Sequence, residues 1–327
     1  MPNTALKVWQ WGQEGTTYGT VVACTAKQAG VLDAEVTWQV VTGQVEELGR
    51  MGPSPLKAQL SRQAAGKLTV VPAFDQMQYL GHAYFGSVAS SGTSGSGQFN
   101  WLYTAPTTAT ETPIVFTVEF GMLNATKRLK GAVGKSFKWS MEAGDFHNIE
   151  MDFIGKDISS TGALTALTDV VVNDKILKAS DTSLWIDGAT GTIGSTLFSG
   201  VLISAELNVD TMRHLKPFVG TTTPANYGTD KWVTSLKLVL EATTAVQDII
   251  DVLSTTGAVD RQIQLTCTYS TNYAAGIKFA GHLSGDIKYW DDRDGNAIVE
   301  TNWVGNHSTA LGSHLILSLI NATSILT

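Results

Sequence analysis

The sequence has little charge, and its two cysteines match no known site. Charged residues make up 16% of the 327 residues, whereas an average soluble domain has about 25%. Cys24 and Cys267 lie far apart and fit no metal-binding or redox spacing, so we expect both to be buried structural residues. No stretch approaches the ~18 to 20 consecutive apolar residues of a membrane helix, and the first residues lack the apolar core of a signal peptide. These absences exclude a small disulfide-stapled fold and predict a soluble protein of about two domains, made in the cytoplasm.

The charge balance indicates how the surface behaves. The net charge is −7 at pH 7, which argues against a protein that grips nucleic acid through its phosphates. A channel through which DNA slides is compatible with this charge. Glycine is abundant, at 32 residues, and ions are sparse, so little desolvation opposes packing of the chain against copies of itself. The neutral coat of a secreted-type β protein fits the composition equally well.

Alternation of apolar and polar residues is the dominant pattern, and it predicts half-buried β-strands. The clearest case is 201–210, whose polar side consists of Ser204, Glu206, Asn208 and Asp210. A second case is 148–153, whose polar side consists of Asn148, Glu150 and Asp152. The pattern recurs at 114–120, 231–241 and 262–269. The predicted fold class is therefore all-β, mainly strands with two short helices.

The helical segments point to an internal duplication. Residues 72–80 start with a proline, which the first turn of a helix tolerates, and residues 244–253 start with Thr244 as a cap candidate. In each half a strand leads into the short helix, and a further strand and a closing group of strands follow. The alternation breaks at 159–166, which marks the expected boundary. We expect two tandem β-sandwich or barrel domains, 1–162 and 163–327.

Residues 87–113 interrupt the first half with a segment of low complexity. Its flanks are rich in Ser, Thr and Gly, as in flexible linkers, and they enclose an aromatic cluster of Phe99, Trp101 and Tyr103. A plain spacer needs no aromatic rings. We expect a loop that becomes ordered on self-assembly, with these rings docking on a neighbouring subunit; the alternative is a disordered surface loop with a small internal hairpin.

Motifs of nucleophilic, nucleotide-binding or zinc-protease sites are absent from the sequence. The six histidines are scattered, and the two nearest, His307 and His314, would face opposite sides of a strand. The acidic run 291–296 lacks the ligand spacing of a calcium loop, and its Asp-Gly step predicts a hairpin turn. We therefore expect no enzymatic activity, no cofactor and no metal.

Two other classes of function remain open at this stage. A glycosidase needs a pair of carboxylates, and the candidates are Glu142, Asp145, Glu150 and Asp152, although a polar strand face ordinarily just meets water. The nine tryptophans could supply sugar-stacking platforms for a carbohydrate-binding or adhesive β-sandwich surface protein. Trp38, however, alternates with Val36 and Val40 as a core residue does. The carbohydrate-binding protein is the second hypothesis and the glycosidase the third.

Three stretches resemble the major tail tube proteins of long, flexible-tailed (siphophage-type) bacteriophages. They are LKAQLSRQAAGKLTVVPAFDQMQYL at 56–80, GKSFKWSMEAGDF at 134–146 and IEMDFIG at 149–155. LWIDG at 184–188, Gly194 and the stretch 197–207 are also similar. The resemblance runs from about residue 56 to the C-terminus as a pattern of strand, glycine and aromatic residues, and 87–113 lies outside it.

The resemblance implies a structural protein of the virion tail. Such proteins have β tube domains, each flanked by a short helix, that close into rings and stack into the hollow tube through which the genome is ejected. Family rings present six tube domains, built from six one-domain chains or from three two-domain chains, and the duplicated element order favours three. The resemblance also implies a tape measure protein and tail-end proteins as partners, and no catalytic residues.

The physics of such a channel predicts which residues line it. An acidic or neutral lining repels DNA phosphates, whereas rows of Lys or Arg would hold the polymer. We therefore expect the polar strand faces to line the channel and DNA to pass without specific binding. The expected lining residues are Asn148, Glu150, Asp152, Ser204, Glu206, Asn208 and Asp210. Edge strands would continue the sheet from one subunit into the next.

Overall fold

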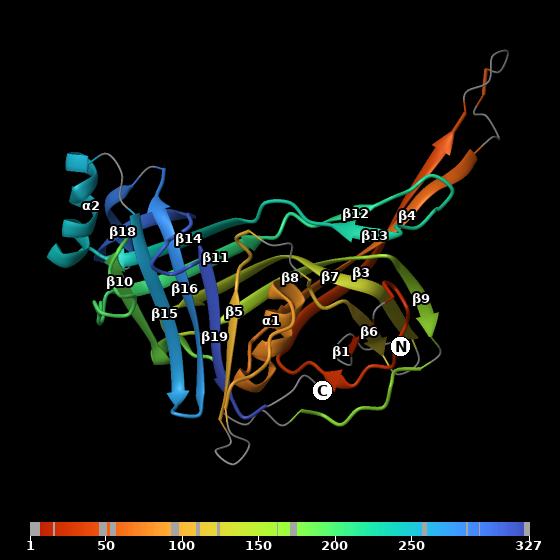
Figure 1. Cartoon of the computed structure of the whole chain (residues 1–327), viewed down its shortest axis with the longest axis horizontal. Coiled ribbons are helices and arrows are strands. Elements are labelled where there is room, and N and C mark those ends of the chain that lie inside the picture. The colour runs from red at the N-terminus through yellow and green to blue at the C-terminus, as the bar shows by residue number, and fades with distance from the viewer. Residues whose placement is uncertain are drawn as a thin grey trace.

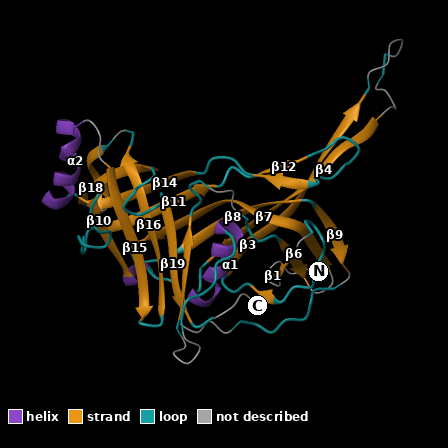
Figure 2. Ribbon diagram, in the orientation of Figure 1, coloured by secondary structure: helices purple, strands orange, loops and turns teal. Residues whose placement is uncertain are grey.

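The protein is built almost entirely of antiparallel strands (Figures 1 and 2). Its structure, a computed structural model, describes residues 7–15, 17–45, 51–52, 57–92, 98–108, 112–122, 125–161, 163–170, 175–256, 260–285, 287–293 and 295–323. Strand pairing connects most of the described strands, and it can be followed as three runs. The all-β fold class is confirmed.

The first run forms a sheet with a strongly aromatic packed face. Its order is β2 (Ala26–Lys27), β1 (Val8–Gln13), β6 (Phe116–Met122), the N-terminal half of β7 (Ala125–Glu142) and β9 (Asp157–Thr161). Alternation in β1 directs Trp9 and Trp11 inward, where both are buried. Their rings lie 5.9 and 5.5 Å from that of Phe153, which belongs to the second run. These rings form the core between the two runs.

The second run carries the polar faces that the alternation predicts. Its order is β3 (Val31–Gln44), β4 (Lys57–Val70), β8 (Asn148–Gly155), the C-terminal half of β7, β11 (Leu202–Asp210), β14 (Val233–Glu241), β18 (Asn296–Gly305) and β17 (Lys288–Arg293). β7 passes from the first run into this one at Gly131, which has a φ of +64°, and at a register shift between Gly134 and Ser136.

The third run lies at the other end of the molecule. Its order is β10 (Thr182–Gly188), β15 (Asp260–Ser270), β16 (Tyr273–Leu283), β19 (Leu315–Asn321) and β5 (Phe99–Thr104). A separate hairpin of β12 (His214–Lys216) and β13 (Asn226–Gly228) runs along the projecting arm of β3 and β4 (Figure 1). The backbone N–H of Arg62 on that arm donates to the carbonyl of Thr222, at 2.7 Å.

The two α-helices differ in their surroundings. α1 (Met77–Phe85) follows the 3-10 turn Phe74–Gln76 and is buried along its whole length, whereas α2 (Thr244–Thr256) lies at one extremity of the molecule (Figure 1). The α-helix predicted over 72–80 therefore starts later than expected, because Pro72 and Ala73 continue the extended chain beyond β4. A second 3-10 turn (Ala179–Asp181) precedes β10.

Strand pairing repeats along the chain. We call β1, β3, β4, α1, β6, β7 and β8 the first set, and β10, β11, β14, α2, β15, β16 and β18 the second set. Each strand pair of the first set has its counterpart in the second, in the same chain order. The pairing of β9 with β7 corresponds likewise to that of β19 with β16. Even a bulge is repeated, after Val31 in β3 and after Leu202 in β11.

Trp38 departs from its predicted place in the core. Its side chain is 48% exposed, and Val40, two residues further along β3, is 47% exposed. Alternation identified the face of β3 correctly, but it cannot tell whether that face is covered at this point along the strand. Trp38 lies opposite Ala64, the first residue of β4 that pairs with β8, and Val40 lies opposite Arg62, beyond that pairing.

Candidate assembly surfaces

The two sets are joined edge to edge within the chain. β7 of the first set pairs with β11 of the second, from Ser136 opposite Asp210 to Glu142 opposite Ser204. Across this junction the Lys138 ammonium lies 2.9 Å from the Glu206 carboxylate. The hydrogen bond to Glu206 raises the pKa of Lys138. Burial opposes ionisation of Glu206, but hydrogen bonds from Asn208 and Lys138 bring its pKa below the ordinary value.

Open edges bound the second run at both ends. Among the described strands, β3 pairs with β4 alone, and β17 pairs with β18 alone. β3 is 14 residues long and carries the exposed apolar side chains of Leu32, Trp38, Val40 and Val41. A long edge strand of this kind is a template for pairing with another chain.

The two open edges are the counterparts of the two joined edges. Glu35 of β3 lies opposite Lys67, as Glu206 of β11 lies opposite Lys237. β17 follows β16 and forms a hairpin with β18, as the C-terminal half of β7 does with β8. In this alignment Asp291 of β17 takes the place of Ser140 of β7. β3 therefore corresponds to β11, and β17 to the joined part of β7.

All seven residues expected to line a channel lie on one face of the second run. β7 separates β8 from β11, and three of its residues align the two strands. Ser136 lies opposite both Asp152 and Asp210, Lys138 opposite both Glu150 and Asn208, and Ser140 opposite both Asn148 and Glu206. Ser204 follows in the same alternation. Residues opposite each other in a sheet project from the same face, so the structure brings these side chains together.

The same face carries charges that the prediction missed. Lys67, Lys138 and Lys237 lie on it, and each is near a carboxylate: Lys67 is 4.0 Å from Asp152, and Lys237 is 2.8 Å from Glu300. The polar phase of the alternation at 231–241 already contained Lys237, so the signal was present in the sequence. Because these ammonium groups have acidic neighbours, they do not form an uncompensated basic row.

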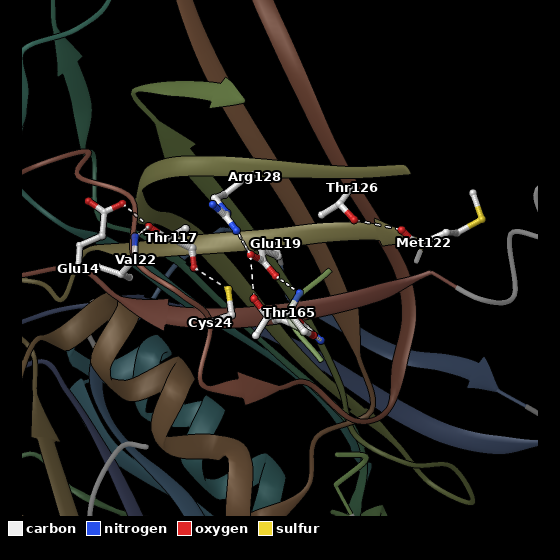
Figure 3. Close-up of polar contacts among 10 residues, drawn as sticks. Glu14, Val22, Cys24, Thr117, Glu119, Met122, Thr126, Arg128 and Thr165 are labelled. Carbon is white, nitrogen blue, oxygen red and sulfur yellow. Dashed lines mark hydrogen bonds and ion pairs between the residues drawn. The ribbon is translucent and has the colours of Figure 1, made fainter. Parts of the chain in front are cut away.

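A buried polar network fixes the segment between the two sets (Figure 3). The fully buried carboxylate of Glu119 on β6 pairs with Arg128 on β7, and it accepts hydrogen bonds from the backbone N–H and the hydroxyl of Thr165, at 2.9 and 3.1 Å. Gln10 donates from its side chain to the Thr165 carbonyl, at 3.1 Å. Residues 163–166, which follow β9 in the predicted boundary 159–166, are therefore anchored to the first sheet at Thr165.

Glu14 lies beside this network, at the other end of β6 (Figure 3). It accepts hydrogen bonds from the backbone N–H groups of Gly19 and Gly131 and from the Thr117 hydroxyl, at 2.7 to 2.8 Å. Burial raises its pKa despite these donors. Cys24, whose thiol donates to the Thr117 carbonyl, is buried as predicted, and burial raises its pKa to about 12. Cys267 is also buried.

The aromatic cluster of 87–113 was predicted wrongly as a docking loop. Phe99, Trp101 and Tyr103 are the inward-facing residues of β5, and all three are buried against the chain's own core. β5 pairs with β19, so a segment from the first half of the chain extends a sheet of the second. The alternating sequence FNWLYT was the missed signal, hidden between low-complexity flanks. These rings are therefore unavailable to a neighbouring subunit.

The described acidic and histidine side chains form no metal cluster, and most of the described tryptophans are buried. Among the residues that the structure describes, no group of three or more His, Cys, Asp or Glu side chains is placed to hold a metal ion. Six of the tryptophans are buried: Trp9, Trp11, Trp101, Trp139, Trp232 and Trp303. Within the acidic run, residues 291–293 end β17 and Asn296 begins β18, and Gly295 has a φ of +82°, so the hairpin predicted here is confirmed. In the regions that can be described, no helix is long and apolar enough to cross a bilayer.

A short sequence repeat could have revealed the correspondence between the two sets. IEMDFIG at 149–155 matches VETNWVG at 299–305, with the glutamate and the final glycine identical. Val299 takes the place of Ile149 in the pairing. Ile149 lies opposite Val70 of β4, and Val299 lies opposite Leu240 of β14, at corresponding places near the ends of these strands. The repeated strand pairing therefore has a counterpart in the sequence as well as in the order of the elements.

Comparison with known proteins identifies the family. The family described as phage tail tube protein matches residues 13–299. Comparison with curated proteins gives no match. Members of this family are structural components of the virion tail, and the family is not an enzyme family. Since the match covers most of an all-β chain, the protein belongs to the phage tail tube protein family.

Proposed function

We propose that three copies of this chain close into a ring, and that rings stack into the hollow tube through which phage DNA is ejected. Each chain supplies two tube-type units, 1–162 and 163–327. The observation that carries this proposal is the β7–β11 junction, because it is one unit-to-unit contact already made within the chain. Repetition of the same contact between chains needs one edge like β7 and one like β11.

The open edges β17 and β3 meet this requirement. In the proposed ring, β17 of one chain pairs with β3 of the next, so that the second run continues around the ring. By correspondence with Glu206 opposite Ser140, Glu35 lies opposite Asp291 of the neighbouring chain. Three chains then supply six units and no open edge of the second run remains, which removes the aggregation hazard of β3.

The polar face of the second run lines the channel in this arrangement. Asn148, Glu150, Asp152, Ser204, Glu206, Asn208 and Asp210 then face the DNA. Carboxylates at these positions repel phosphates, and the nearby carboxylates offset Lys67, Lys138 and Lys237. DNA passes without specific binding. Passage of DNA through the tube requires no catalysis. The tube contacts a tape measure protein and tail-end proteins.

Engineered disulfides test the ring directly. In Glu35→Cys/Asp291→Cys protein, assembly under oxidising conditions forms interchain disulfides, and non-reducing electrophoresis shows dimers and trimers with trimer as the limit. Ser140→Cys/Glu206→Cys is the matched control, because it places the same pair of positions at the intrachain junction and gives cross-linked monomer. Electron microscopy of the untreated protein shows rings or tubes of fixed diameter. Tubes without this cross-link, or a ladder that continues to six chains, contradict the proposed pairing or the number of chains.

A further inference from the structure

Helix α1 lies at the junction of the two sets. The Phe74 ring before it is 6.2 Å from that of Tyr273, and Gln78 accepts a hydrogen bond from the Asn321 amide at 3.1 Å. At the other end, the Phe85 ring is 5.3 Å from that of Trp232. Arg213, which follows β11, donates to the carbonyls of Ala83 and Tyr84. α1 thus covers one end of the second set.

Helix α2 corresponds to this segment residue by residue. Thr244 follows Leu240 of β14 by the same four positions as Phe74 follows Val70 of β4. Val246 and Ile250 are buried against the second set. In this alignment Asp248 takes the place of Gln78, which contacts the second set, and Asp251 takes that of Gly81. Both aspartates are exposed.

At the end of the second set that α1 covers, the side chains are buried. The corresponding side chains of the first set are exposed, and we call this end of the first set its open end. Trp38 and Val40 take the places of Val209 and Thr211, which are 2% and 0% exposed, whereas Trp38 and Val40 are each about half exposed. Lys127 of β7 lies opposite Ser160 of β9, as Ile277 of β16 lies opposite Leu317 of β19. Ile277 and Leu317 are buried, whereas Lys127 and Ser160 are exposed.

We propose that α2 of one copy packs into this open end of the first set of the next copy, as α1 does within the chain. The inference rests on the proposed ring and adds a second contact to it, away from the strand edges. Asp248 then meets Lys127 of the next copy, and the apolar part of α2 covers Trp38. The charges agree with this assignment, because Asp248 of α2 faces Lys127, whereas the intrachain counterparts Gln78, Ile277 and Leu317 are uncharged.

Charge reversal with rescue tests the contact. Asp248→Lys and Lys127→Asp each place like charges together, so we expect each to raise the protein concentration needed for tube formation by about tenfold or more. The double variant restores the opposite charges and returns this concentration close to that of the wild-type protein. Asp169→Lys makes the same charge change on the segment between the sets, at a side chain that is 83% exposed and pairs with Lys27; it costs one exposed ion pair and leaves assembly unchanged. Circular dichroism confirms that each variant is folded.

Cross-linking separates failure of this contact from failure of the ring. α2 and β9 lie at opposite extremities of one molecule (Figure 1), so a disulfide in Asp248→Cys/Lys127→Cys protein joins two copies and gives trimer as the limit. Wild-type tubes with no such disulfide, or charge variants that assemble normally, overturn the α2 contact and leave the ring intact. Absence of rings from the wild-type protein overturns both.

Discussion

Helices α1 and α2 occupy corresponding places in the two sets, yet one is enclosed and the other is not. All nine residues of α1 are buried, whereas Asp248 and Asp251 of α2 are exposed. The difference comes from what lies next to each helix. α1 has the second set and β5 beside it, whereas among the described residues no other set packs against α2. Corresponding helices can therefore be interior or at the surface according to what packs against them.

The strongest way to break this comparison is to remove the side chain that binds α1 to the second set. The guanidinium of Arg213 is buried and donates to the carbonyls of Ala83, Tyr84 and Gly134. Arg213→Ala leaves these acceptors unsatisfied and opens a cavity, so we expect a loss of about 4 kcal/mol in the free energy of unfolding. Urea denaturation measures it. Arg213→Lys recovers little, because an ammonium cannot reproduce the planar fork.

Acid weakens the α1 junction through His82. Burial lowers the pKa of His82 to about 4, despite the hydrogen bond to the Gly86 carbonyl, and its ring packs edge-on against those of Trp101 and Tyr103. Because the unfolded chain binds this proton near pH 6.5, stability from His82 is complete above that pH and is lost as the pH falls toward 4. We expect a loss of about 2 kcal/mol between pH 7 and pH 5.

His82→Gln is the variant that isolates this effect. The amide keeps a donor for Gly86 and does not titrate, so its free energy of unfolding falls less between pH 7 and pH 5 than that of the wild-type protein. Buried His147, whose pKa is also about 4, remains in both proteins and cancels in the comparison. Equal pH dependence of the two proteins would show that His82 is already solvated at the junction.

A substitution at Trp38 tests the comparison at the open end of the first set. Its ring is half exposed and stacks only on the Arg62 guanidinium among the ring contacts described, with 5.6 Å to the ring centroid. Trp38→Ala therefore costs less than about 1 kcal/mol in the unassembled chain. If α2 of another copy covers this ring, the same variant raises the concentration needed for tube formation by about tenfold. Val209→Ala, at the corresponding closed position, reverses this pattern: urea denaturation shows a loss of about 1 to 2 kcal/mol.

Particular residues show how far sequence reasoning reached. Alternation located β8 and β11 and the side of each strand, because a half-buried strand imposes a period of two. For α1 the sequence predicted a helix but not its bounds, because a helix that is buried on all sides shows no clear apolar stripe to mark where it begins and ends. Alternation failed for Trp38 because it predicts the face of the strand on which a side chain lies, but not whether another part of the protein packs against that face. Which polar faces come together depends on β7, whose pairing with β11 is a long-range contact that no local pattern encodes.

The channel lining gives the smallest effect on the protein itself. Glu150 and Glu206 lie on the polar face on either side of Lys138, and the Glu206 side chain is 36% exposed. Glu150→Lys/Glu206→Lys costs an exposed ion pair, typically below about 1 kcal/mol, so tubes still assemble. The six units of a ring would then carry a basic row instead of a compensated one, and phosphates would bind it by counterion release. We expect phage with this tube to eject DNA more slowly than phage with Glu150→Gln/Glu206→Gln, most clearly at low salt. Equal ejection rates at every salt concentration would remove these two residues from the channel wall while leaving the β7–β11 junction as the model for contacts between chains.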